Sequence, residues 1–158
     1  MKKYYYNSPI GTIEITGSEN GIASLYFVET ENVYTDCPEC LAKCVKQIDE
    51  YFNKKRKIFD LKFDLQGTDF QKRVWTELLK IPYGKTCSYL DIAKAIGNKL
   101  SIRAVGNANG KNPVSIIIPC HRVIGSDGNL VGYGGGLWRK KWLLDFENKS
   151  QTELFDSI

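Results

Sequence analysis

The feature that most constrains the fold of this chain is a change in hydrophobic period between residues 30 and 39. Residues 2–28 contain the strand-length runs "KYYY", "TIEIT" and "IASLYFV", separated by the turn-forming stretches "NSPIG" and "GSENG". From about Glu39 to Lys57, apolar side chains instead recur every three or four positions, as on one face of a helix. This order predicts a small antiparallel meander followed by a helix.

Two capping boxes mark helices in the second half of the chain. Thr68 is followed by Gln71 and Ser88 by Asp91, a spacing that lets each pair satisfy free N–H groups at the start of a helix. Behind the first box, the predicted buried stripe consists of Phe70, Val74, Trp75, Leu78 and Leu79. Gly97 ends the second helix, and a third short helix, "IRAVGNANG", follows. Two short helices joined by a glycine-containing turn predict a helix-turn-helix.

These patterns predict an α+β protein of two parts. Residues 1–64 would form a small N-terminal α/β domain with a three-stranded antiparallel sheet, which supports the rest. Residues 65–158 would form a mostly helical domain that contains the helix-turn-helix. The first part carries 9 Lys and Arg against 10 Asp and Glu, and the second carries 13 against 8. The positive charge of the second part favours an anionic partner there.

The cysteines and the apolar runs bear on the compartment. The five cysteines are odd in number, and "MKKYYYNSPIG" has no apolar stretch behind its lysines, so we expect free thiols in a reducing, cytoplasmic setting. The apolar runs are far shorter than the roughly 20 residues of a membrane span. "CPEC" matches half of a zinc site, but no second pair completes it. We therefore favour small buried thiols at Cys37, Cys40 and Cys44, and predict no metal.

A cysteine beside the only histidine is the main candidate for chemistry. "PVSIII" predicts a buried strand, and Pro119 ends it just before Cys120 and His121. Neighbours in a strand face apart, so the two side chains cooperate only if the chain turns at the proline or a water bridges them. A basic neighbour that lowers the pKa of the thiol would raise its thiolate fraction. For an arbitrary Cys-His pair, however, a buried thiol beside an exposed histidine is the commoner arrangement.

A histidine that accepts a proton needs its other nitrogen held by an acceptor, ideally a carboxylate. Asp145 and Glu147 both follow the helical pattern "WRKKWLLDFEN" in the basic half. Spacing does not choose between them.

The stretch "GNANGKNPVSIIIPCHRVIGSDGNLVGYGGGLWRKKWLL", residues 106–144, closely resembles the O6-alkylguanine-DNA alkyltransferases, also called methylated-DNA–protein-cysteine methyltransferases. "PCHRV" is the signature of that family, and the likeness extends upstream through "GTDFQKRVWTELLKIPYGKTCSYLDIAKAIG". The resemblance implies a ribonuclease H-like N-terminal domain and a winged-helix-like C-terminal domain. It also implies direct-reversal repair of O6-alkylguanine in DNA without a cofactor.

The resemblance assigns the chemistry to five residues. Cys120 matches the alkyl acceptor, and His121 matches the base that draws off the thiol proton through a water. Glu147 matches the acid that orients the histidine, which is the choice that spacing leaves open. Asn112 matches the residue that braces the turn, and Tyr89 matches the tyrosine that rotates the target nucleotide and assists proton delivery to the guanine.

The resemblance also assigns substrate and DNA contacts. The substrate-binding group comprises Val123, Tyr133, Gly134 and Gly135. Some relatives carry serine at Gly134, so a hydroxyl contact to the base is lost here. The DNA-binding group comprises Arg103, Ala104, Ala108, Asn109, Gly110, Lys111 and Arg122. Arg103 would fill the space of the flipped nucleotide. By their charge, Lys111 and Arg122 are candidate phosphate contacts.

The expected partner is double-stranded DNA that carries O6-alkylguanine, bound through the minor groove by a monomer without contact to a membrane. Activity on O4-alkylthymine, the range of alkyl groups and cooperativity along DNA are left open. An alternative is a protein that recognises alkylated bases without transfer; such relatives replace the acceptor cysteine, so Cys120 argues against it. Another is a Cys-His hydrolase, which would turn over, whereas a thioether offers no labile carbonyl and ends the reaction.

Overall fold

The computed structural model describes residues 1–30 and 36–156, the side chains of residues 150–156 excepted. The chain folds into two compact units. Unit 1 comprises Met1–Gln66 with Pro113–Ser115, and unit 2 comprises Gly67–Asn112 with Ile116–Ile158. The division into an N-terminal supporting domain, 1–64, and a C-terminal functional domain, 65–158, stays a prediction.

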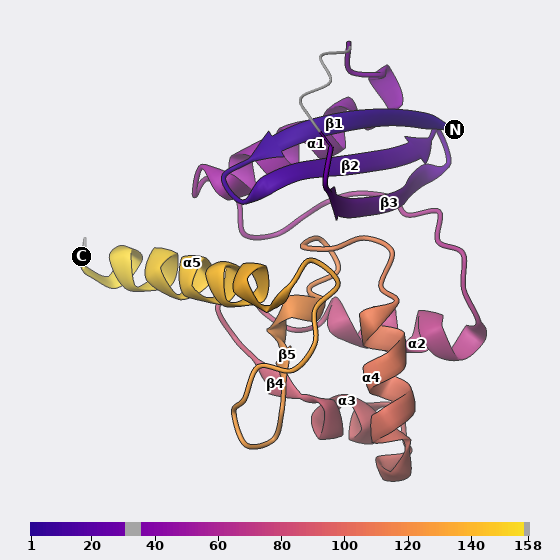
Figure 1. Cartoon of the computed structure of the whole chain (residues 1–158), viewed down its shortest axis with the longest axis vertical. Helices are drawn as coiled ribbons and strands as arrows, with labels where there is room; N and C mark the ends of the chain where they lie inside the picture. The colour runs from indigo at the N-terminus through magenta and orange to yellow at the C-terminus, as the bar shows by residue number, and fades with distance from the viewer. Residues whose placement is uncertain (31–35, 157–158) are drawn as a thin grey trace. The chain divides into compact units, whose positions relative to one another are not determined.

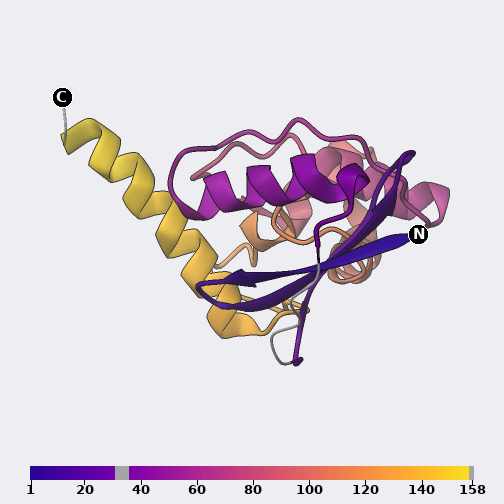
Figure 2. The same cartoon turned by 90° about the horizontal axis from the view of Figure 1, so that it is seen from above.

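Unit 1 contains the predicted meander. Strands β1 (Lys2–Ser8), β2 (Gly11–Ser18) and β3 (Gly21–Val28) form an antiparallel sheet in the order β1-β2-β3. Helix α1 (Glu39–Phe52) packs against this sheet (Figures 1 and 2). Alternation in β2 places Ile13 and Ile15 in the core, where both are fully buried. The predicted sheet and helix are therefore confirmed.

Helix α1 ends earlier than its apolar pattern predicts. Its last residue is Phe52, and Lys54 has a positive φ of 62°, so the basic tail lies outside the helix. The buried face contains Gln47, while the apolar Val45 is only half-buried. Gln47 is buried because its amide accepts from the Asp60 N–H at 2.9 Å and donates to the Asp60 carbonyl at 3.1 Å.

Unit 2 is mostly helical (Figure 1). It contains α2 (Asp69–Leu78), α3 (Tyr89–Ala95), α4 (Ile102–Gly110) and α5 (Leu137–Asp156), the 3-10 turns η1 (Lys99–Ser101) and η2 (Cys120–Arg122), and the parallel pair β4 (Cys87–Ser88) and β5 (Val123–Ile124). Across residues 1–30 and 36–156, the helices are too short or too polar to span a bilayer.

Both predicted capping boxes are formed, at Thr68 for α2 and at Ser88 for α3. Helix α2 buries Val74, Trp75 and Leu78, and the Trp75 indole N–H donates to the Ala108 carbonyl of α4 at 2.9 Å. The prediction that Leu79 is buried is wrong. It follows the last residue of α2 and is 45% exposed.

The run "PVSIII" is buried but is not a strand. It forms one isolated bridge, from Val114 to Leu25, and then turns through Ile116, which has a positive φ of 71°. The Asn112 side-chain N–H donates to the Ile118 carbonyl at 2.7 Å and closes this turn. The sequence pattern is that of a core segment, and burial alone does not distinguish a strand from an irregular turn.

Candidate functional site

Cys120 begins the 3-10 turn η2, directly after Pro119. The Cys120 N–H donates to the Ile118 carbonyl at 2.8 Å, and its side chain is 5% exposed. The chain therefore turns at the proline, as required for Cys120 and His121 to serve one site. His121 is fully buried, which excludes the alternative of an exposed histidine beside a buried thiol.

The carboxylate that reaches His121 is Glu147, from α5. Its Oε2 lies 2.8 Å from His121 Nε2, and the Glu147 side chain is 1% exposed. Asp145, the alternative that spacing leaves open, is an exposed residue paired with Lys141 at 2.8 Å. Asp145 and Glu147 are only two positions apart on α5, yet the first faces solvent and the second lies in the buried site.

Arg122 holds the same carboxylate from the other side. Its Nε donates to Glu147 Oε1 at 2.8 Å, its Nη2 to Oε2 at 3.0 Å, and its Nη1 to the Ile81 carbonyl at 2.8 Å. The residue is only 6% exposed. The guanidinium expected to contact a DNA phosphate is thus buried here and bound to Glu147.

These partners decide where the protons lie. Burial alone would raise the pKa of Glu147, but His121 and Arg122 together hold it well below its usual range. Since an ionised carboxylate only accepts, His121 Nε2 carries the hydrogen of their shared bond. In the neutral imidazole, His121 Nδ1 is then the acceptor nitrogen. It is buried and, among the described residues, forms no hydrogen bond.

The surroundings of the Cys120 thiol disfavour its thiolate form on balance. Burial raises its pKa, and this effect exceeds the opposing effects of the Asn112 amide and of Lys140. A cationic neighbour, Lys140, does lower the pKa of the thiol, but removal of the sulfur from water outweighs this effect. The proton must leave as the sulfur attacks.

Tyr89 and Asn109 lie beside Cys120. The Tyr89 hydroxyl donates to the Val131 carbonyl at 2.8 Å, and burial and the nearby Cys120 raise its pKa while Asn109 lowers it. The Asn109 side-chain N–H lies 3.5 Å from the Cys120 carbonyl. The structure thus brings Tyr89 and Asn109 to the Cys120–His121–Glu147 cluster, and Asn112 also hydrogen-bonds to Cys120 there.

The four predicted substrate-binding residues differ in their surroundings. Val123 is buried in β5, where it pairs with Cys87 of β4. Tyr133 and Gly135 are half-buried in the loop before α5, and Gly134 is exposed there. A Cβ atom added at Gly134 would meet no atom within 4 Å, so this position has room for a larger side chain.

Helix α4 presents only part of its predicted DNA-binding face to solvent. Arg103, Ala104, Gly110 and the following Lys111 are exposed. Ala108 and Asn109, which are also expected to contact DNA, are only 2% and 5% exposed. Ala104 and Ala108 are four positions apart, whereas a helix has 3.6 residues per turn. Ala108 is therefore offset around the helix from Ala104 and packs against α2. Sequence reasoning missed Asn107, which is exposed between Ala104 and Lys111 at helical spacing.

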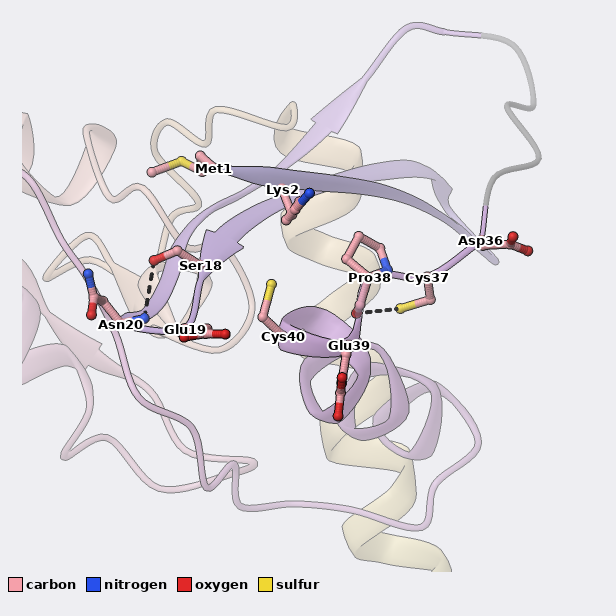
Figure 3. A pocket seen from close by; sticks show the side chains of 10 residues that line it. All are labelled: Met1, Lys2, Ser18, Glu19, Asn20, Asp36, Cys37, Pro38, Glu39 and Cys40. Carbon is pink, nitrogen blue, oxygen red and sulfur yellow. Dashed lines mark hydrogen bonds between the residues drawn. The ribbon is translucent and has the colours of Figure 1, made fainter.

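Unit 1 contains a separate pocket of about 740 Å³, lined in part by Cys37 and Cys40 (Figure 3). The Cys37 thiol donates to the Pro38 carbonyl at 3.5 Å, and all five cysteines are free. Cys44 is buried as predicted, but Cys37 is exposed because it precedes the first residue of α1. Within the described residues, no group of three or more His, Cys, Asp or Glu side chains is arranged to hold a metal ion.

Both halves of the chain match known family profiles. Residues 1–65 match the family described as 6-O-methylguanine DNA methyltransferase, ribonuclease-like domain, and residues 69–149 match its DNA binding domain. A methylated-DNA–protein-cysteine methyltransferase from Mycobacterium bovis is 45% identical, over 95% of this chain and 96% of that protein. One from Methanosarcina barkeri is also 45% identical, over 92% and 98%.

Solved structures agree with these matches. The O6-methylguanine methyltransferase of Mycobacterium tuberculosis superposes with a TM-score of 0.85 at 44% identity, covering 94% of this chain and 93% of that one. A structure of Mycobacterium tuberculosis OGT in complex with DNA also gives a TM-score of 0.85, at 46% identity and 92% coverage of both chains. The predicted fold, a three-stranded antiparallel sheet followed by a helical part, is thereby confirmed.

Proposed function

The chain belongs to the 6-O-methylguanine DNA methyltransferase family, whose members repair DNA by direct reversal, and on this premise we propose that Cys120 is its alkyl acceptor. The observation that carries the proposal is the arrangement in η2. A buried thiol is followed directly by a buried histidine, whose Nε2 is bound to Glu147 at 2.8 Å. This arrangement leaves His121 Nδ1 to receive the thiol proton.

The proposed reaction is a displacement at the alkyl carbon. As the Cys120 proton passes to His121 Nδ1, directly or through a water, the sulfur electron pair forms a bond to the alkyl carbon. The bond between that carbon and guanine O6 breaks, and its electron pair stays with the guanine. Tyr89 assists delivery of a proton to the departing base. The products are unmodified guanine and a thioether on Cys120.

The two positioning residues act on different parts of this step. Arg122 keeps Glu147 ionised and fixed, so Glu147 stabilises positive charge on His121 as the proton arrives. Asn112 donates to the Ile118 carbonyl and holds the turn before Cys120. A thioether has no labile bond for water to attack, so each protein molecule acts once.

We further propose double-stranded DNA that contains O6-alkylguanine as the partner. The DNA complex of the related Mycobacterium tuberculosis protein supports DNA itself. A base inside a duplex hides its O6 group, so the nucleotide must be flipped out. The exposed face of α4 suits entry into the minor groove, with Arg103 filling the vacated space. We propose a monomer that works in the cytoplasm without a cofactor.

The experiment that tests this function is intact-mass analysis after mixing the protein with a duplex containing O6-methylguanine. One added CH2 group, mapped to Cys120 and absent in Cys120→Ser, is the expected result. Binding of the duplex without any mass change would replace the proposal by recognition without transfer.

A further inference from the structure

Asn109, in α4, is a buried amide that the chemistry described so far does not use. It is 5% exposed. Its side-chain N–H lies 3.5 Å from the Cys120 carbonyl, at the outer limit of a hydrogen bond. Its Oδ1 is buried and, among the described residues, forms no hydrogen bond. An amide removed from water with so few partners is costly, whereas a leucine of similar shape would fill the same space without that cost.

The partners of the amide fix which of its atoms faces the site. A carbonyl oxygen only accepts, so the Asn109 atom beside the Cys120 carbonyl is Nδ2. Asn109 also hydrogen-bonds to the Tyr89 side chain. The Tyr89 hydroxyl donates its own hydrogen to the Val131 carbonyl at 2.8 Å, so its oxygen accepts from Asn109. The amide is therefore a donor to the Tyr89 oxygen.

A donor at this oxygen favours the ionised form of the tyrosine. Burial and the nearby Cys120 raise the pKa of Tyr89, and the hydrogen bond from Asn109 acts in the opposite direction. Two titratable groups from other elements also face Tyr89: the Cys120 thiol of η2 and the Lys140 ammonium of α5, which lies 5.9 Å from the centre of the ring. Unlike them, the amide does not titrate, so it remains a donor at every pH of the reaction.

We propose that Asn109 is a positioning residue for alkyl transfer, which stabilises the negative charge that develops on the Tyr89 oxygen as Tyr89 gives its proton to the departing guanine. This inference rests on the proposed reaction at Cys120. The thiol proton goes to His121, the sulfur pair bonds to the alkyl carbon, and the C–O6 pair leaves with guanine, which takes the Tyr89 proton. The proton held by His121 then returns to Tyr89 through water. Asn109 keeps its protons throughout.

The test begins with Asn109→Leu, which keeps the shape of the side chain but has no donor. Transfer from the methylated duplex should slow about tenfold, since the variant lacks one hydrogen bond to a charged oxygen. The thermal midpoint should not fall, because a poorly paired buried amide is removed as well. The matched control is Asn53→Leu, in which an exposed amide that donates to the Asp49 carbonyl at 2.8 Å is lost. This control should keep the wild-type rate.

Two comparisons separate the tyrosine from other roles of the amide. In a Tyr89→Phe background the hydroxyl is gone, so the further cost of Asn109→Leu should drop below about twofold. An equal cost in both backgrounds would mean that the amide acts by packing alone, and would overturn the proposal. A free-base substrate should show the same slowing as the duplex. A loss confined to duplex DNA would instead make Asn109 a contact to the groove, which also overturns it.

The hydrogen bond can be tested without alkyl transfer. Cys120→Ser removes the titration of the thiol, and 3-fluorotyrosine, which has a more acidic phenol, makes the tyrosines visible by fluorine NMR. The Tyr89 signal, identified by its absence in Tyr89→Phe, should titrate about one pH unit higher when Asn109→Leu is added. Identical titrations would contradict the proposal.

A last measurement keeps Asn109 intact. Its side-chain amide signal in nitrogen NMR should move as Tyr89 ionises, and a signal that stays in place would overturn the proposal even if Asn109→Leu does not fold. If wild-type Cys120 takes up no alkyl group, the proposed function fails, and the two NMR titrations still decide whether Asn109 stabilises the ionised tyrosine.

Discussion

Replacement of Glu147 by glutamine should separate the stability of the site from its chemistry. The carboxylate is 1% exposed and makes three short contacts: 2.8 Å to His121 Nε2, 2.8 Å to Arg122 Nε and 3.0 Å to Arg122 Nη2. An amide of nearly the same shape keeps the packing but removes the charge. The Arg122 guanidinium, 6% exposed, is then buried without a counter-ion.

The magnitude follows from that unpaired cation. Removal of one partner of a buried ion pair costs about 3–5 kcal/mol of unfolding free energy. A domain of this size has about 5–15 kcal/mol in total, so Glu147→Gln should fold but denature at clearly lower urea concentration. Transfer to Cys120 should slow by about 100-fold or more, since His121 loses the charge that stabilises its protonated form.

A second substitution distinguishes the two effects. In Glu147→Gln/Arg122→Met the buried cation is gone as well, and apolar replacement of a whole ion pair is often close to neutral. The double variant should therefore regain most of the lost stability, measured by urea denaturation. It should not regain the single-turnover rate. Recovery of the rate together with the stability would refute the orienting role of Glu147, as would a single variant with unchanged stability.

Three further predictions address DNA, the loop and pH. Arg103→Ala should slow transfer from duplex DNA far more than transfer from a free-base substrate, and equal losses would undo its role in flipping. Gly134→Ser should leave the thermal midpoint unchanged, because its Cβ has open space. It should also speed transfer about 2–10-fold through one added hydrogen bond to the base; a slower or less stable variant contradicts this. The folded-state pKa of Glu147 lies below its ordinary value of 4.5, so the unfolded state binds more protons between the two. The free energy of unfolding should therefore fall as the pH drops below 4.5. In acid denaturation, Glu147→Gln should lose less unfolding free energy than the wild type over the same pH range.

Local signals in the sequence predicted local structure well. The capping boxes at Thr68 and Ser88 lie within single helical turns, so no distant contact is needed to form them. The meander follows from alternation and turns of the same kind. The run "PVSIII" failed as a strand because its burial reflects a core position, and the positive φ of Ile116 depends on the surrounding fold.

The candidate site shows where such reasoning stops. Lys140 and Lys141 are adjacent and chemically identical, yet the first is fully buried and the second is largely exposed. From the sequence alone, Arg122 is a candidate surface contact for a phosphate; its hydrogen bond to Glu147 is visible only in the structure. Arg122 binds a partner distant in sequence and Lys140 binds carbonyls of the preceding loop, and no pattern of neighbouring residues encodes either contact. Residue identity alone therefore favoured a DNA contact for Arg122.

Cys120 is consumed by the proposed reaction, and the most direct test counts the alkyl transfers that each protein molecule performs. Protein is mixed with a large excess of duplex containing O6-methylguanine, and the restored guanine is measured against protein concentration. The account predicts one guanine restored for each active molecule, with the added CH2 group on Cys120 in equal amount. Continued restoration beyond one per molecule, or restoration without a modified Cys120, would contradict it.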